Sequence, residues 1–320
     1  MISGIHPVHY PSYTCIEDII ACVANYWKRA HVLMFSEVWN FRYDPMEGKL
    51  LPFGDRIRTN KGNYGAYTRY HGLSIEHTGE MKYGSLMPLI KDNLADNRPV
   101  AIYIDSYWCP WNEAYQKHHF PHYCLIIDLD DEKEIARCLD PYLTGDIQEL
   151  PYGHIMRGTD HGYTFQAVDL LNEGLDRHAV VSRAARRILE QPPGRENAID
   201  SIRRFARDIG SELDLSFESQ RYETARIVPL FKLLSYVGWA RVNFSALLDH
   251  FAHECEDRQF ETWAKQFAEI GNLWLVVQKM MVKECIYSSP RFSRESIRDR
   301  LLDIADREED MADSILRRMA

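Results

Sequence analysis

Two helices are predicted in the first hundred residues of the chain, the first of them from apolar positions that recur at helical spacing. This pattern runs from Thr14 to about Arg29, where Thr14 is a plausible N-cap and Glu17 falls in the first turn. A second helix is predicted from about Ser85 to Asp96, because the segment Asn97-Arg98-Pro99 disfavours its continuation. Residues 41 to 80 are rich in glycine, tyrosine and arginine, which predicts loops and short strands.

Short apolar runs after these two helices predict a β-sheet. The predicted strands are Val100 to Tyr107, His122 to Leu129, Ile135 to Leu139 and Gly162 to Ala167. An acidic turn, residues 130 to 134, joins the second and third runs, so we expect an antiparallel hairpin. This hairpin would bring Asp140 back toward His122. A loop containing His154 and Arg157 is expected before the last strand.

The pattern becomes helical throughout after about Asn172. The helical runs are Ala179 to Leu189, Ala198 to Ile209, Ile227 to Glu254, Phe260 to Cys285 and Arg294 to Arg317. We therefore predict an α+β protein in which residues 1 to 172 form a domain with an antiparallel sheet, and residues 173 to 320 form an all-α domain.

Three residues carry the candidate chemistry, and their order in the chain is that of a papain-like site. Cys15 lies at a helix start, where backbone N–H groups favour a thiolate and can receive an oxyanion. His122, at the head of a strand, is the candidate base, and Asp140 would hold the imidazole in one tautomer. Each residue also has a competing interpretation. Cys15 could be a buried structural cysteine, and Asp140 could cap a turn. His122 could be a structural histidine or part of a metal cluster with His118 and His119.

Weaker predictions concern the oxyanion hole and the substrate. His9 lies six residues before Cys15, where sites of this class often have a glutamine, and Tyr13 is also near. Glu37 and Tyr107 are further candidates for substrate contacts. Aromatic loop residues would exclude water and seat an acceptor, or would serve ordinary packing; these are Tyr64, Tyr67, Tyr70, Tyr107, Trp108 and Trp111.

Charge and composition narrow the function class. The formal net charge of -9 and the isoelectric point near 5.8 argue against nucleic acid as the main partner. The start of the chain lacks the pattern of a signal peptide, and no apolar run is long enough to span a membrane, so we expect a cytoplasmic protein. Seven cysteines without a C-x-x-C pair are typical of reduced thiols rather than of a zinc site.

At this point the sequence resembles a known family. The motifs are Cys15 at a helix start, Ser36-Glu37, Arg98-Pro99-Val100, His119-Phe120-Pro121-His122-Tyr123 and Asp140-Pro141. They resemble the butirosin biosynthesis protein H family, within the papain-like folds related to C39 peptidases. The helical second half, with Trp274 and residues 302 to 308, is similar to the helical C-terminal part of that family. Thr14 and Ile16 flank Cys15 where the family usually has a histidine and a small residue.

The resemblance implies an acyltransferase with Cys15 as nucleophile, His122 as base and Asp140 as orienting carboxylate. The acyl group would come from a phosphopantetheine thioester on an acyl or peptidyl carrier protein and pass to an amine of a small molecule. It implies no bound cofactor and no metal. A cysteine hydrolase on the same fold and a non-catalytic binding protein stay open as alternatives, as does a homo-oligomer. Arginines of the second half, such as Arg183 and Arg187, are either a docking face for the acidic carrier protein or simply solvated.

Overall fold

The computed structural model describes residues 2–45, 51–59, 67–169, 174–287 and 293–319. The chain forms two compact units, and each combines segments that are remote in sequence. The first, here called the sheet unit, comprises Met1–Leu33 and Tyr64–Glu173. The second, here called the helical unit, comprises Met34–Asn63 and Gly174–Ala320. A single division near residue 172 therefore does not describe the molecule, because residues 34–63 pack with the helices.

The sheet unit is built around a six-stranded antiparallel sheet with the order β3-β8-β4-β5-β6-β7. Its strands are β3 (Leu73–His77), β4 (Val100–Asp105), β5 (Pro121–Asp130), β6 (Ile135–Leu139), β7 (Gln148–Pro151) and β8 (Gly162–Ala167). Strands β5 and β6 form the expected antiparallel hairpin. The runs predicted for β6 and β8 agree with the structure residue for residue.

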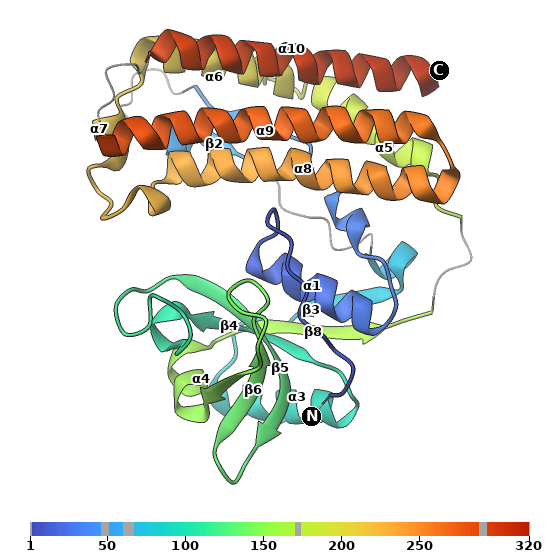
Figure 1. Cartoon of the computed structure of the whole chain (residues 1–320), viewed down its shortest axis with the longest axis vertical. Coiled ribbons are helices and arrows are strands. Elements are labelled where there is room, and N and C mark those ends of the chain that lie inside the picture. The colour runs from blue at the N-terminus through green and yellow to red at the C-terminus, as the bar shows by residue number, and fades with distance from the viewer. Residues whose placement is uncertain (1, 46–50, 60–66, 170–173, 288–292, 320) are drawn as a thin grey trace. The chain divides into compact units, whose positions relative to one another are not determined.

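Helices cover the sheet unit's core (Figure 1). They are α1 (Cys15–Tyr26), α3 (Tyr83–Ala95) and α4 (Tyr152–Gly158), with a short π-helical turn η2 at Tyr67–His71 and a 3₁₀ turn η3 at Ser106–Trp108. One core cluster joins α3 and α4 to alternate residues of the strands, including Ile90, Ile102, Cys124, Ile126 and Ile155. Helix α1 buries Ile19, Ile20 and Val23 completely, so its position, and with it that of Cys15, is fixed by packing.

Two sequence predictions in this unit need correction. The segment with His154 and Arg157 is helix α4 rather than a loop, and Ile155 anchors this short helix in the core. A seven-residue helix offers too few turns for its periodicity to be recognised in the sequence. The first predicted strand ends at Asp105 instead of Tyr107, because the Asp105 carboxylate accepts a hydrogen bond from the Tyr107 N–H (3.1 Å) and caps the turn η3.

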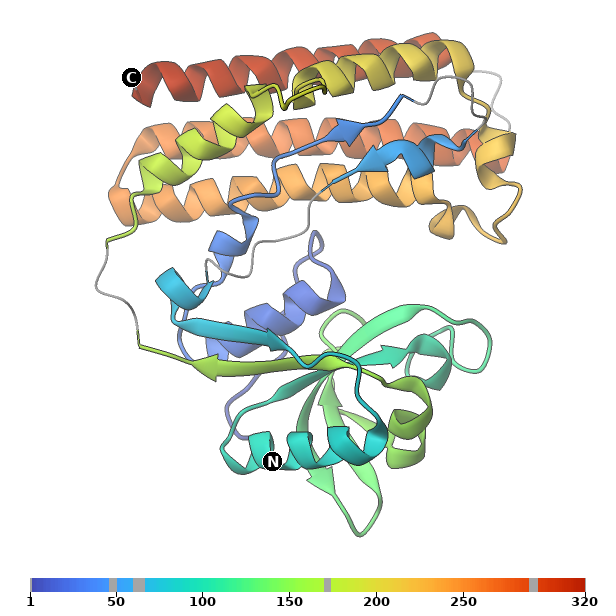
Figure 2. The ribbon, with the colours of Figure 1, turned by 180° about the vertical axis from the view of Figure 1, so that it is seen from behind.

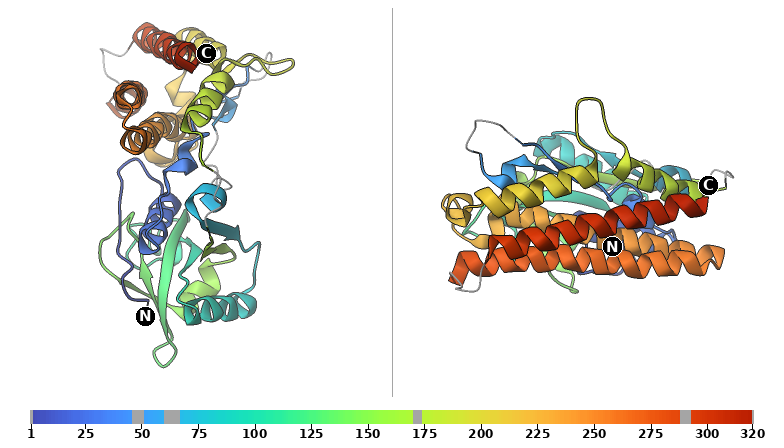
Figure 3. Two further views of the ribbon diagram at one scale, coloured as in Figure 1. Left: turned by 90° about the vertical axis from the view of Figure 1, so that its right-hand side faces the viewer. Right: turned by 90° about the horizontal axis from the view of Figure 1, so that it is seen from above.

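The helical unit consists of long helices that lie side by side (Figures 1 and 3). Its helices after residue 173 are α5 (Arg177–Leu189), α6 (Ala198–Glu212), α7 (Leu215–Ser219), η4 (Ala225–Ile227), α8 (Pro229–Cys255), α9 (Arg258–Tyr287) and α10 (Arg294–Met319). Gly238 of α8 and Gly271 of α9 face each other. A Cβ on Gly271 would lie 2.8 Å from the Gly238 carbonyl oxygen, so close approach of the two helices requires glycine there.

The segment 34–63 contributes a two-stranded ribbon to the helical unit, which Figure 2 shows from behind. Strand β1 (Arg42–Tyr43) pairs with β2 (Ile57–Arg58), next to the short helix α2 (Phe53–Arg56); the 3₁₀ turn η1 (Val32–Phe35) precedes them. Aromatic packing draws this segment to the helices: the rings of Trp39 and Phe267 lie 4.6 Å apart, and those of Phe41 and Trp274 lie 5.4 Å apart.

The α+β class, with an antiparallel sheet and a helical C-terminal part, is confirmed. Among the helices in the described part of the chain, none is long and apolar enough to cross a membrane.

Candidate functional site

Cys15 is the first residue of α1 and is partly exposed. The helix begins there because Thr14 acts as N-cap, and the Thr14 N–H donates to the Glu17 carboxylate at 2.7 Å, as in a capping box. The thiol therefore lies at the positive end of the helix, beside backbone N–H groups that have no partner within it. Cys22, on the same helix, is fully buried, and burial raises the pKa of its thiol to about 12.

The hairpin of β5 and β6 brings His122 and Asp140 together. His122 is the second residue of β5, and Asp140 follows the last residue of β6. The Nε2 atom of His122 lies 2.6 Å from Oδ2 of Asp140. The Cys15 side chain is near enough to contribute to the raised pKa of His122. Since Nε2 faces Asp140, Nδ1 is the ring nitrogen left for an interaction with the sulfur.

This environment favours the charged imidazole of His122. Its side chain is only 6% exposed, and such burial alone would lower the pKa of His122. The hydrogen bonds to Asp140 and Cys15, together with the negative charges of these groups, outweigh burial and raise the pKa to about 10. The surroundings of His122 therefore favour its imidazolium form beside the Cys15 side chain.

Trp111 also belongs to the site. The sequence analysis predicted it only as one of the aromatic loop residues. Its Nε1–H donates to Oδ2 of Asp140 at 2.6 Å, the same oxygen that faces His122. The other oxygen, Oδ1, is buried and has no hydrogen-bond partner among the described residues. Because Trp111 reaches Asp140 across 29 positions of sequence, no local pattern could have identified this contact.

A second pair of histidine and carboxylate lies close to the first. His9 Nδ1 is 2.7 Å from Oδ2 of Asp18, and the Tyr10 N–H donates to Oδ1 of Asp18 at 3.0 Å. Asp18 is completely buried, and burial raises its pKa despite these bonds. The ring of Tyr142 lies 6.0 Å from the ring of His9 and 6.2 Å from that of His122. His9 thus belongs to the surroundings of the site, and its Nε2 is not engaged by Asp18.

The remaining predicted residues have other partners. The hydroxyl of Tyr13 lies 3.1 Å from His31 Nε2, and burial raises the pKa of this phenol. Tyr107 stacks on His119 with ring centroids 4.5 Å apart. Glu37 belongs to the helical unit, where its carboxylate pairs with Arg187 at 2.9 Å.

The aromatic loop residues are spread over the unit. Trp108 stacks beneath the guanidinium of Arg157, 5.1 Å from the ring centroid. Tyr67 is fully buried, and Arg69 lies over the ring of Tyr70. Tyr64 lies outside the described residues.

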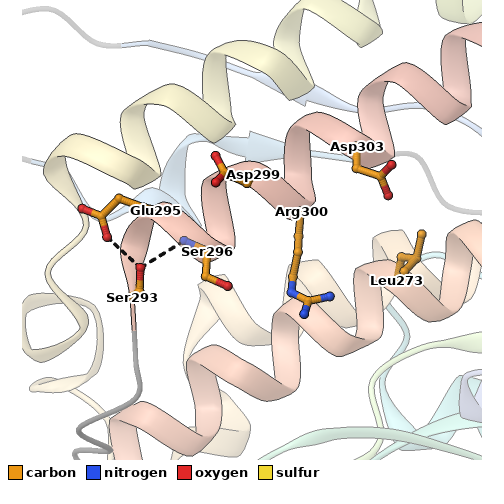
Figure 4. A pocket seen from close by; sticks show the side chains of 7 residues that line it. All are labelled: Leu273, Ser293, Glu295, Ser296, Asp299, Arg300 and Asp303. Carbon is orange, nitrogen blue, oxygen red and sulfur yellow. Dashed lines mark hydrogen bonds between the residues drawn. The ribbon is translucent and has the colours of Figure 1, made fainter.

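Other candidate sites are weaker. Within the described ranges, no group of three histidine, cysteine or acidic side chains is arranged to hold a metal ion, and His119 instead pairs with Asp105 at 2.6 Å. A cavity of about 530 Å³ lies in the helical unit (Figure 4). It is lined by Leu273, Ser293, Glu295, Ser296, Asp299, Arg300 and Asp303. The Ser293 hydroxyl donates to the Glu295 carboxylate at 2.7 Å and accepts from the Ser296 N–H at 3.1 Å, so its bonds are those of a cap at the start of α10.

Comparison with known proteins finds a family match for the region that holds the site. No curated protein matches the chain. Residues 14–141 match the family described as butirosin biosynthesis protein H, N-terminal. The matched residues begin at the N-cap of α1 and end directly after Asp140, so they include Cys15, His122 and Asp140. This match supports the assignment of residues 14–141 to a butirosin biosynthesis protein H-like family.

Proposed function

We propose that the protein is a cysteine-dependent acyltransferase of specialised metabolism. It takes an acyl group from the phosphopantetheine thioester of a carrier protein and passes it to an amine of a small molecule. Cys15 is the nucleophile, His122 the acid and base, and Asp140 the group that orients the imidazole. The hydrogen-bonded pair of His122 and Asp140 carries this proposal, together with a cysteine at the start of α1 that helps to raise the pKa of His122. The family's link to antibiotic biosynthesis supports it.

The first step forms the acyl-enzyme. The thiolate of Cys15 attacks the thioester carbon, and the resulting tetrahedral intermediate expels the pantetheine sulfur, which takes the proton of the His122 imidazolium. Thioester exchange needs little driving force, because a C–S bond forms as another breaks. The step leaves His122 neutral, and Asp140 fixes its ring with Nδ1 toward the reacting atoms.

The second step transfers the acyl group. The amine attacks the acyl-Cys15 carbon, neutral His122 takes a proton from the attacking nitrogen, and the Cys15 sulfur leaves as a thiolate. The amide is released, and the ion pair of Cys15 and His122 is restored.

Both steps develop negative charge on the carbonyl oxygen. The backbone N–H of Cys15, at the start of α1, is one candidate donor to this oxygen. His9 is the second candidate: with Nδ1 engaged by Asp18, its Nε2 can donate to the oxyanion only in the imidazolium form. Asp18 thus has the role of orienting His9, parallel to the role of Asp140 toward His122.

Intact-protein mass spectrometry tests the proposal. The enzyme is incubated with simple acyl thioesters and with acylated carrier protein, without added ATP or metal. We expect a mass gain of one acyl group for the wild type and none for Cys15→Ala. Cys255→Ala is the matched control, because Cys255 is also a free thiol but is exposed and lies in the helical unit. A mass gain that persists in Cys15→Ala would contradict the assignment.

The same experiment separates the alternatives. A hydrolase would release free acid at the same rate with or without an amine, whereas a transferase would give amide in proportion to the amine supplied. A binding protein would form no adduct, and iodoacetamide would label Cys15 no faster than Cys255 below pH about 8.5, the pKa of a free cysteine.

A further inference from the structure

A second chain of hydrogen bonds starts at the residue next to His122. The hydroxyl of Tyr123 lies 2.9 Å from Nε2 of His161, and Nδ1 of His161 lies 2.5 Å from Oδ1 of Asp160. The side chain of His161 is 22% exposed and that of Asp160 is 64% exposed. This chain therefore runs from a half-buried phenol to a carboxylate in contact with water.

The sheet holds this chain in place. Tyr103 of β4 lies directly opposite Tyr123 of β5, so both side chains project from the same face. The ring of Tyr103 stacks on His161 with centroids 4.7 Å apart and an angle of 17° between planes. Tyr163 of β8 lies beside Tyr123, at 5.8 Å between centroids. His161 is thus fixed between aromatic rings, and its orientation does not depend on Asp160 alone.

The inner end of the chain is close to the nucleophile. Helix α1, which begins with Cys15, packs against β5, the strand that carries Tyr123. The pKa of Tyr123 is raised first by burial, then by the charge of Tyr163 and by that of Cys15. The phenol therefore remains protonated and lies within electrostatic reach of the sulfur. A hydroxyl with these properties can receive a proton on its oxygen only while it passes its own proton onward.

We propose, resting on the function proposed above, that Tyr123, His161 and Asp160 form a proton relay that deprotonates the acceptor's ammonium group before it attacks acyl-Cys15. The ammonium gives a proton to the Tyr123 oxygen, and the Tyr123 proton moves to His161 Nε2. The imidazolium that forms is stabilised by Asp160 and then loses a proton to water.

The need for this relay follows from the proton balance. An alkylamine with a pKa near that of lysine, about 10.4, is almost entirely an ammonium ion at neutral pH. It must lose two protons to become an amide nitrogen with one hydrogen. His122, neutral in the acyl-enzyme, accepts only one of them. The other leaves through the relay, which agrees with the net release of one proton when a thioester and an ammonium ion give an amide and a thiol. Water as acceptor would not need the relay.

Single-turnover kinetics of Tyr123→Phe and His161→Gln test the relay. The enzyme is first acylated with a simple thioester and then mixed with an alkylamine or with hydroxylamine, which is largely uncharged at neutral pH. We expect unchanged acylation and unchanged transfer to hydroxylamine. Transfer to the alkylamine should fall about 10²-fold, the value of one general base. In the variants this rate should rise about tenfold per pH unit, in step with the free amine.

Tyr103→Phe is the matched control, because it removes a phenol hydroxyl from the same face while the ring that stacks on His161 remains. We expect wild-type rates for both nucleophiles. If Tyr123→Phe and His161→Gln slow both nucleophiles equally, or slow neither, the relay is wrong while the acyltransferase assignment stands. If the wild type forms no acyl-Cys15 adduct, the proposed function fails and the relay fails with it.

Discussion

Each unit of the molecule buries a carboxylate completely, and the two are bonded in different ways. In the helical unit, both oxygens of Glu308 accept two hydrogen bonds each, all at 2.9 Å. The donors are Nε and Nη2 of Arg241 and the indole N–H groups of Trp39 and Trp274. In the sheet unit, Oδ2 of Asp140 lies 2.6 Å from both Trp111 Nε1 and His122 Nε2, and Oδ1 has no partner among the described residues.

The difference separates a structural carboxylate from a functional one. A buried charge is stable when all its lone pairs are satisfied and its counter-ion is fixed. Glu308 meets this condition with an arginine, which cannot lose its proton, and it ties segment 34–63 to three helices. Asp140 is incompletely satisfied, and its charged partner is a histidine, whose charge would change in the proposed acyl transfer. Incomplete bonding of a buried carboxylate beside a titratable group is thus the feature that marks the site.

The two isosteric amide substitutions would test this distinction most strongly. Asp140→Asn keeps the shape of the side chain but removes the charge that orients and stabilises the His122 imidazolium. We expect acyl transfer per folded molecule to fall about 10⁴-fold, as in other triads of this kind, and the melting temperature at neutral pH to fall as well, because the charged His122 loses its partner. Single-turnover acylation and thermal denaturation measure the two effects. A variant that unfolds but keeps its rate per folded molecule would assign Asp140 to structure instead.

Glu308→Gln should have the opposite outcome. It leaves Arg241 buried with an uncompensated charge, which costs about 3–5 kcal/mol of unfolding free energy. The rate of acylation per folded molecule should stay that of the wild type. Urea denaturation measures the free energy of unfolding, and active-site titration counts the folded enzyme. A normal stability with lost acylation would reverse the roles given to the two carboxylates.

Much of the sheet unit, and the contact of His122 with Asp140, could be predicted from sequence, because their cause is local. Helix α1 starts at a capping box, and the hairpin that joins His122 to Asp140 turns at the charged residues 131–134. Trp111 and the Tyr123–His161 contact could not be predicted in this way, since each joins residues about 30 to 40 positions apart. The packing of segment 34–63 with the helices could not be predicted for the same reason, since Trp39 donates a hydrogen bond to Glu308, which is 269 positions away in sequence.

The charge on His122 makes the stability of the sheet unit depend on pH. The pKa of His122 is raised to about 10 in the folded protein, from about 6.5 in the unfolded chain. Its contribution is therefore complete below pH about 6.5 and is lost as the pH rises toward 10, by at most about 1.4 kcal/mol per pH unit. Thermal denaturation between pH 6 and 10 should show this decline, and Asp140→Asn should flatten it. An equal slope in both proteins would mean that other groups cause it.

The smallest expected effects come from removing a single indole donor from each of the two carboxylates. Trp111→Phe removes one of two partners from Oδ2 of Asp140, so the carboxylate holds His122 less firmly. We expect acyl transfer to fall about tenfold, equal to about 1.4 kcal/mol. Trp39→Phe removes one of four donors from Glu308 and should cost about 1–3 kcal/mol of unfolding free energy without changing transfer.

The double variant Trp111→Phe/Asp140→Asn decides whether the indole of Trp111 acts through the Asp140 carboxylate. If it does, adding Trp111→Phe to Asp140→Asn changes the rate no further; a further tenfold loss would mean that Trp111 contacts the substrate independently of Asp140.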